Sequence, residues 1–184
     1  MRRLFTAIKI KPAHKLVTAI EDFSRELSRE KIKWINPENI HITLKFFGNT
    51  PESDIPAIKS SLLDASRGLC EFDVTVKGCG TFGSPRFPRV IWLGLENSDR
   101  LKTLYNKINY ELSKVGVKPD ERSFSPHLTI GRVKHIKNLY ALDALVSKYH
   151  DETLLTQSVN SFQLFESVLQ REGPKYLVLE NFRI

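Results

Sequence analysis

Two short stretches of this chain, 86 positions apart, are each built around a His-x-Thr sequence. Residues 39–47 contain His41-Ile42-Thr43-Leu44, and residues 124–131 contain His127-Leu128-Thr129-Ile130. Both stretches are rich in β-branched and aromatic residues, which is typical of β-strands. Side chains two positions apart on a strand share a face, so each histidine lies beside its threonine while the apolar residue between them points the other way. The pattern therefore predicts two similar strands, each of which presents one imidazole and one hydroxyl.

The similarity extends along most of the chain. When the sequence is shifted by 86 positions against itself, three strand-like segments fall on one another, at residues 2–8, 88–94 and 174–180. Extended segments at 72–76 and 159–165 correspond in the same way. Between the strands lie four stretches with the apolar spacing of amphipathic helices, at 15–27, 51–63, 101–112 and 139–146. The order strand-helix-strand-helix-strand thus occurs twice at one ungapped offset, which indicates an internal duplication.

A duplicated chain of this kind predicts an α+β fold that is bilobal. We expect pseudo-twofold related units whose mainly antiparallel sheets line a central cleft. No linker, low-complexity stretch or block of charge separates the halves. We therefore expect residues 1–184 to form a single compact two-lobed domain, in which a pseudo-twofold axis brings His41 and His127 face to face.

Composition narrows the class of partner. The net charge of +7 favours a polyanion such as a nucleic acid or a nucleotide. The apolar runs are shorter than a membrane span, and residues 1–10 are typical of a first strand rather than of a secretion signal. The two cysteines, Cys70 and Cys79, have neither the spacing of a zinc site nor the number of a disulfide scaffold. We therefore expect a cytoplasmic monomer that has no membrane association.

Two imidazoles that face each other can perform acid–base chemistry at a phosphoester. In-line displacement at phosphorus needs a nucleophile and a leaving group on opposite sides, so a base and an acid must face each other. Histidine suits both roles because its pKa lies near neutrality. Zinc binding by His41 and His127 is a rival interpretation, but no Cys, Asp or Glu stands at ligand spacing beside either histidine. We therefore expect neither a metal nor a cofactor.

The paired His-x-Thr-hydrophobic sequences resemble the 2H phosphoesterase superfamily, and within it most closely the RNA 2′,3′-cyclic phosphodiesterase (2′-5′ RNA ligase) family. The resemblance implies a bilobal α+β fold and metal-independent hydrolysis of RNA 2′,3′-cyclic phosphate ends to 2′-phosphomonoesters, with 2′-5′ RNA ligation as the reverse reaction. It also implies that His41 is the proton donor and His127 the proton acceptor. The expected partner is RNA that ends in a 2′,3′-cyclic phosphate, with tRNA-derived RNA as one candidate.

Three further residues are candidates for binding the substrate phosphate. The resemblance implies that the hydroxyls of Thr43 and Thr129 donate to its non-bridging oxygens. Arg132 follows the second motif, and a guanidinium can donate to two phosphate oxygens at once. On a regular strand, however, Arg132 would point away from His127, because the two are five positions apart. A bulge or a strand end at Gly131 would turn it back toward the site.

Contacts with an RNA base are the least constrained part of the sequence. Phe46 and Phe82 are candidates for base stacking, although packing in the core is the commoner role for such residues. Residues 82–89 are aromatic, basic and rich in turn formers, so we expect a loop here that contacts RNA through Arg86 and Arg89. Further cations near the second motif would widen the positive surface or simply be solvated, namely Lys118, Arg122, Lys134 and Lys137.

Two alternatives to RNA end hydrolysis stay open. A phosphoesterase of the same superfamily could act on a small cyclic nucleotide. An RNA- or nucleotide-binding module could use the two His-x-Thr sites only to hold phosphate, without turnover.

Overall fold

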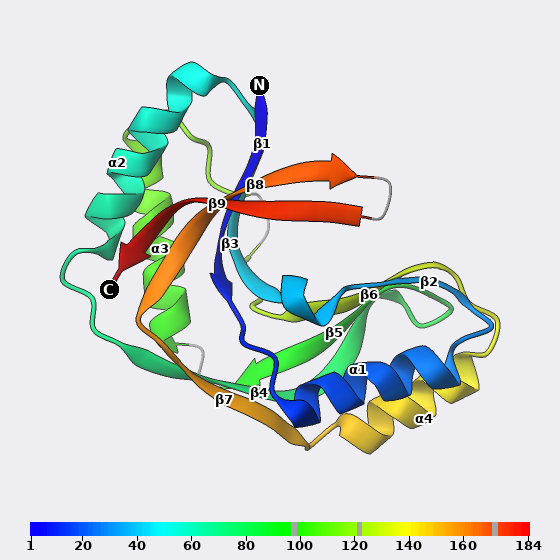
Figure 1. The fold of residues 1–184 in the computed structure, drawn as a ribbon. Coiled ribbons are helices and arrows are strands. Elements are labelled where there is room, and N and C mark those ends of the chain that lie inside the picture. Colours follow the sequence, from blue (N-terminus) through cyan, green and yellow to red (C-terminus); the bar gives the residue numbers. More distant parts are fainter. Residues whose placement is uncertain (97–98, 121–122, 171–172) are drawn as a thin grey trace.

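The computed structural model describes residues 1–96, 99–120, 123–170 and 173–184, and over these ranges the chain forms two antiparallel sheets (Figure 1). The first sheet has the order β3-β1-β8-β9, formed by His41–Thr50, Arg2–Lys9, Ser161–Gln170 and Gly173–Arg183. The second has the order β2-β6-β5-β4-β7, formed by Lys31–Trp34, Leu128–His135, Phe87–Glu96, Phe72–Ser84 and Thr153–Val159. The predicted α+β class with antiparallel sheets is confirmed.

Each sheet is covered by a pair of helices. The helices α1 (His14–Glu26) and α4 (Leu139–Tyr149) pack on each other and on the second sheet, while α2 (Ile55–Ser66) and α3 (Asp99–Ser113) pack on each other and on the first (Figure 1). Their buried residues recur every three to four positions, as in Leu101, Leu104, Ile108 and Leu112 of α3. The amphipathic spacing thus predicted all four helices, although α2 begins later than expected, after a 3₁₀ turn at Glu52–Asp54. No helix of the described residues is long and apolar enough to cross a membrane.

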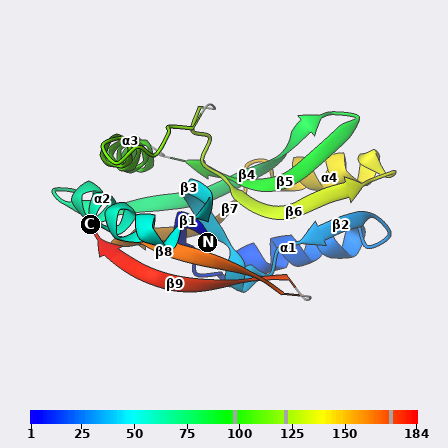
Figure 2. The ribbon, with the colours of Figure 1, turned by 90° about the horizontal axis from the view of Figure 1, so that it is seen from above.

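The two lobes are not the two halves of the sequence. In the first sheet, β1 and β3 come from the first repeat, but the strand β8 that pairs with β1 comes from the second. In the second sheet, β5 and β6 come from the second repeat, and β4 from the first pairs with β5. Figure 2 shows β8 and β9 on one side of the molecule and β4, β5 and β6 on the other. Because each sheet needs both repeats, we propose that residues 1–184 form one domain.

The pairing of the strands corrects the ungapped offset. Thr43 lies opposite Ala7 on β1, and its counterpart Thr129 lies opposite Trp92 on β5. Ala7 therefore corresponds to Trp92, at an offset of 85, and not to Leu93 as the shift of 86 predicts. The difference matters because strand side chains alternate in direction, so that a slip of one residue exchanges the two faces. In the structure, Leu93 packs in the main hydrophobic core, whereas Ala7 packs with Phe5 and Phe165 in a separate small cluster.

The sequence did not predict β2 and β7, and it was wrong about residues 82–89. β2 is an edge strand of the second sheet with only four residues, so its alternation of lysines with Ile32 and Trp34 is too short to stand out in the sequence. Residues 82–89 are not a loop, because they form the end of the β4–β5 hairpin, with only Pro85 and Arg86 in the turn. Since β-branched residues are few here, tertiary pairing and not local propensity makes this segment extended.

Candidate active site

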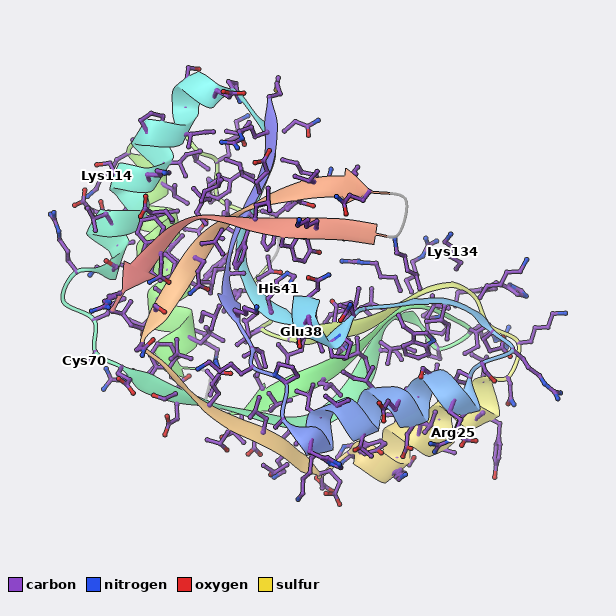
Figure 3. The ribbon with its side chains drawn as sticks, in the orientation of Figure 1. Arg25, Glu38, His41, Cys70, Lys114 and Lys134 are labelled. Carbon is purple, nitrogen blue, oxygen red and sulfur yellow. The ribbon has the colours of Figure 1, made fainter. Side chains whose placement is uncertain are left out.

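Both His-x-Thr strands open onto one cavity of about 460 Å³ between the two sheets. It is lined by His41 and Thr43 from β3 and by His127, Thr129 and Arg132 from β6 and the residue before it. In Figure 3, His41 lies near the middle of the molecule, between the β8–β9 hairpin and the second sheet. Phe46 also lines the cavity, so the fold brings together six of the predicted site residues from two distant parts of the sequence.

The two histidines are held in the same way. Nδ1 of His41 lies 2.7 Å from the backbone oxygen of Asn39, and Nδ1 of His127 lies 2.7 Å from that of Ser125. A carbonyl oxygen can only accept a hydrogen bond, so each Nδ1 carries the proton and donates it. Each neutral ring therefore has its lone pair on Nε2, which makes Nε2 the atom that can take up or release a proton.

A β-bulge follows each threonine and decides which residue enters the cavity. Leu44 has no partner in the β1–β3 ladder, and Ile130 has none in the β5–β6 ladder. Each extra residue shifts the alternation by one, so that the residue three positions after the threonine returns to the face of the histidine. That residue is Phe46 in the first strand and Arg132 in the second, and both line the cavity. The predicted bulge is thus confirmed, one position earlier than Gly131.

Gly131 supports this arrangement through a close approach. The ring of Trp34 on β2 lies directly over it, and a Cβ atom at position 131 would come within 2.9 Å of that ring. Any larger residue would push β2 away from β6.

The ring of His41 packs among aromatic side chains. The centroid of the Phe5 ring lies 5.0 Å from that of His41, and Tyr176 on β9 presents its ring at 90° to the imidazole. Burial lowers the pKa of His41, the carbonyl of Asn39 opposes this, and the positive charge of Arg132 lowers the pKa further. His127, by comparison, has an edge contact with Phe82, at 4.8 Å between ring centroids.

The cavity is cationic. Arg3, Lys33 and Arg132 line it, and no carboxylate does so among the described residues. Arg3 also lies over the ring of Phe46, at 4.8 Å from its centroid, while Phe46 stays half exposed (49%). Sequence reasoning missed Arg3, Lys33 and Tyr176. Arg3 carried a signal, since it belongs to a predicted strand two positions before Phe5, but the topology that brings β2 and β9 to the site has no local signal.

Three of the predicted RNA contacts lie outside this cavity. Phe82 contacts the ring of His127 but does not line the cavity, and Arg86 and Arg89 are exposed on the β4–β5 hairpin, away from its lining. Arg122 lies outside the described residues. Of the four candidate RNA contacts, Phe46 alone lines the cavity, and contact of the other three with RNA stays a prediction.

A buried lysine connects the two motifs. Nζ of Lys45, on β3, donates to the backbone oxygen of Lys118 at 2.8 Å and to the carboxylate of Asp120 at 2.9 Å. Its side chain is only 3% exposed. The contact ties the first His-x-Thr strand to the segment that leads into the second, so it helps to fix the position of His127 relative to His41.

The donor set around the histidines does not suit a metal ion. Across the described ranges, no three His, Cys, Asp or Glu side chains are grouped so that they could bind one. Both Nδ1 atoms are already engaged with carbonyl groups, which leaves two Nε2 atoms and, within the described lining, no carboxylate. We therefore derive no step that passes through a metal.

Comparison with known proteins agrees with this geometry. The family model described as LigT like Phosphoesterase matches the chain twice, over residues 8–92 and 93–176. The two matches begin 85 positions apart, in agreement with the strand register. Proteins named RNA 2′,3′-cyclic phosphodiesterase are similar to this chain. The one from Methanothermobacter thermautotrophicus is 36% identical and covers 91% of this chain and 90% of its own length, and the one from Archaeoglobus fulgidus is 34% identical, with 98% and 99% covered.

Solved structures show the same fold. TT0787 of Thermus thermophilus has a TM-score of 0.79 and 24% identity, covering 98% of this chain and 97% of its own. LigT of E. coli, solved with 3′-AMP, has a TM-score of 0.72 and 21% identity, covering 100% and 98%. With the family model matched over both repeats and relatives above 30% identity over nearly the whole chain, this protein belongs to the LigT-like family of 2H phosphoesterases.

Proposed function

We propose that this protein hydrolyses 2′,3′-cyclic phosphate ends of RNA to 2′-phosphomonoesters. The observation that carries the proposal is the pair of imidazoles on one cavity, each with Nδ1 tied to a carbonyl and Nε2 left for chemistry. The curated relatives have the name RNA 2′,3′-cyclic phosphodiesterase. The cationic lining and the net charge of +7 suit a polyanionic substrate.

The two histidines take opposite roles in this reaction. Nε2 of His127 accepts a proton from a water molecule as its oxygen attacks phosphorus. The bond between phosphorus and the 3′-oxygen breaks, and protonated His41 donates its Nε2 proton to that oxygen. The product is a 2′-phosphomonoester with a free 3′-hydroxyl, and exchange with solvent then restores the protons of the pair. With the 5′-hydroxyl of a second RNA in place of water, the same step breaks the bond to the 3′-oxygen and forms a 2′-5′ bond, and its reverse cleaves that bond.

The remaining residues hold the phosphate and the terminal nucleoside. Thr43 and Thr129 donate their hydroxyls to the non-bridging oxygens, one from each side of the cavity. Arg132 neutralises the charge that these oxygens carry and can donate two hydrogen bonds to them. Phe46 is half exposed at the rim and offers a face on which the terminal base stacks.

The low pKa of His41 fits the role of proton donor only when substrate is bound. Burial and Arg132 favour the neutral ring in the free enzyme. A phosphate anion bound beside His41 favours the charged ring, and it also neutralises Arg132. We therefore propose that the substrate itself raises the pKa of His41 and charges the acid when it is needed.

The test is incubation of the protein with an RNA that ends in a 2′,3′-cyclic phosphate, with a chelator present. We expect a 2′-phosphate end and full activity despite the chelator. A 3′-phosphate end would contradict the 3′-oxygen as the leaving group, because the acid would then have to protonate the 2′-oxygen. RNA binding without any product would favour the alternative of a phosphate-binding module. Strong inhibition by the chelator would contradict the metal-independent mechanism.

A further inference from the structure

Two further grooves adjoin the catalytic cavity and share lining residues with it. The first, of about 280 Å³, lies between β2 and the β8–β9 hairpin and shares Lys33, Ile35, Pro174 and Tyr176 with the cavity. The second, of about 500 Å³, lies between β3, the start of α2 and the segment after α3, and it shares only Phe46 with the cavity. Either groove could hold the part of a longer RNA that extends beyond the cavity. We call them the hairpin groove and the α2 groove.

The charges of the two grooves differ. The described residues that line the hairpin groove include Lys33 and Lys175 and no carboxylate. Arg171 and Glu172, which lie outside the described residues, have opposite charges. The α2 groove contains Asp54 and Asp120. One of its two lysines, Lys45, is buried and already paired with Asp120. A chain of phosphodiesters is therefore attracted to the hairpin groove more strongly than to the α2 groove.

The entrance of the hairpin groove holds like charges side by side. Lys33 on β2 lies directly opposite Arg132 on β6. Like charges opposite each other on neighbouring strands destabilise a sheet. Lys31, two positions before Lys33, is also exposed and shares its face, so the positive charge continues along β2 away from the histidines. An anion with several regularly spaced charges offsets this repulsion, whereas one terminal phosphate reaches only the innermost cations.

Amide side chains complete the lining of the hairpin groove. Asn36, Asn39 and Gln170 line it, and amides can bind the 2′-hydroxyls that distinguish RNA from DNA. Asn39 also connects the groove to the catalytic cavity, because its backbone oxygen holds Nδ1 of His41 and its side chain donates to the backbone oxygen of Pro174. Contacts in the groove thus act on the same segment that positions His41.

We propose that the RNA chain on the 5′ side of the cyclic phosphate leaves through the hairpin groove, with Lys33 and Lys175 bound to its phosphates. The proposal rests on the proposed function. It makes an oligonucleotide, and not a cyclic mononucleotide, the preferred substrate. The terminal nucleotide occupies the catalytic cavity, and the next phosphates lie along β2 and the start of β9.

The test compares two substrates with the same reacting end. One is an RNA hexamer that ends in a 2′,3′-cyclic phosphate, and the other is the matching nucleoside 2′,3′-cyclic phosphate. For the unmodified protein we expect a higher kcat/KM for the hexamer. Lys33→Ala and Lys175→Ala should each reduce the ratio of the two kcat/KM values by about fivefold, the upper range for an exposed charge pair. Lys118→Ala, which removes a lysine of the α2 groove, is the matched control and should leave the ratio unchanged.

The salt dependence gives a second, independent measurement. Each lost phosphate contact should lower the slope of log KM for the hexamer against log salt by about 0.7, the value for a single-stranded nucleic acid. The double variant should therefore lose about 1.4.

Three outcomes would overturn the proposal while leaving the proposed function intact. The first is equal kcat/KM for hexamer and mononucleotide, the second is an unchanged ratio in both lysine variants, and the third is a loss in Lys118→Ala as large as theirs. Failure of the unmodified protein to hydrolyse either substrate would instead contradict the proposed function. The melting temperature of each variant shows whether a lower ratio of the two kcat/KM values comes from a folding defect. We expect no such defect, because these lysines lie at the surface.

Discussion

The two His-x-Thr strands share a backbone and differ in chemistry. Both hold Nδ1 of the histidine on a carbonyl two residues earlier, and both insert one extra residue after the threonine. The bulge then delivers Phe46 to the cavity in one strand and Arg132 in the other. His41 packs against the rings of Phe5 and Tyr176, whereas His127 has an edge contact with Phe82. A duplicated scaffold thus supplies two imidazoles in register, while the residue after each bulge is aromatic in one strand and cationic in the other.

The largest expected effect comes from removing the histidine that each of the two strands carries. His41→Ala and His127→Ala should each lower kcat by about 10²–10⁴-fold, the usual contribution of a general acid or base. The double variant should be little slower than either single one, because the two residues act as a unit. Single-turnover hydrolysis of RNA with a 2′,3′-cyclic phosphate end measures this. His14→Ala, an exposed histidine on α1, serves as the control. Near-full turnover by either variant would contradict the assigned roles.

A second test makes the two strands alike at the bulge. Arg132→Phe gives the second strand the residue that the first has at position 46. We expect kcat/KM to fall by about 10- to 100-fold, since a hydrogen bond to a charged group contributes about 1.5–3 kcal/mol. Arg132→Lys should recover only part of this, because an ammonium group cannot donate to two oxygens in the same fork.

The control for this test is Arg29→Gln, which removes an exposed arginine just after α1, away from the cavity lining. A variant Arg132→Phe with unchanged kcat/KM would show that the bulge does not serve phosphate binding.

The contacts of Lys45 and Gly131, which hold the two His-x-Thr strands in place, can be tested by measuring the free energy of unfolding. Lys45→Met removes the contacts of Nζ with Asp120 and with the backbone oxygen of Lys118. We expect a loss of about 1–3 kcal/mol in the free energy of unfolding, because the backbone oxygen of Lys118 and the carboxylate of Asp120 both lose their part-buried donor. Gly131→Ala should cost a similar amount, about 1–3 kcal/mol, because the new methyl group meets the ring of Trp34. Urea unfolding of each variant measures both.

The smallest expected effect is a shift in the pKa of His41. In the free protein the pKa of His41 should lie below the usual value of about 6.5, since burial disfavours the charged ring. Arg132→Gln removes a positive charge that lowers the pKa of His41, so it should raise that pKa. Imidazole NMR titration measures the pKa directly, and a fall in Arg132→Gln would contradict this account.

Local patterns predicted the parts of the site that lie within one strand. His41 beside Thr43 and His127 beside Thr129 follow from the alternation of side chains, and the helices follow from apolar spacing. Prediction failed where partners from elsewhere decide the outcome. The offset of 86 aligned Ala7 with Leu93, although Ala7 corresponds to Trp92. Only the pairing of Thr129 with Trp92 in the sheet reveals this slip of one residue. Arg86 and Arg89 were predicted to contact RNA from a loop, but they lie on a β-hairpin and do not line the cavity, and their contact with RNA stays a prediction.

The sequence by itself determined the duplication, the α+β class and the four residues of the twin motif, because these depend on periodicity along a single segment. Only the tertiary structure decided that Arg132 enters the cavity, that Lys33 lies opposite it, and that Tyr176 packs against His41. The physical reason is that strands from both repeats share each sheet. The neighbours of a residue are then set by hydrogen-bonded register between segments far apart in the chain, and not by the residues that flank it.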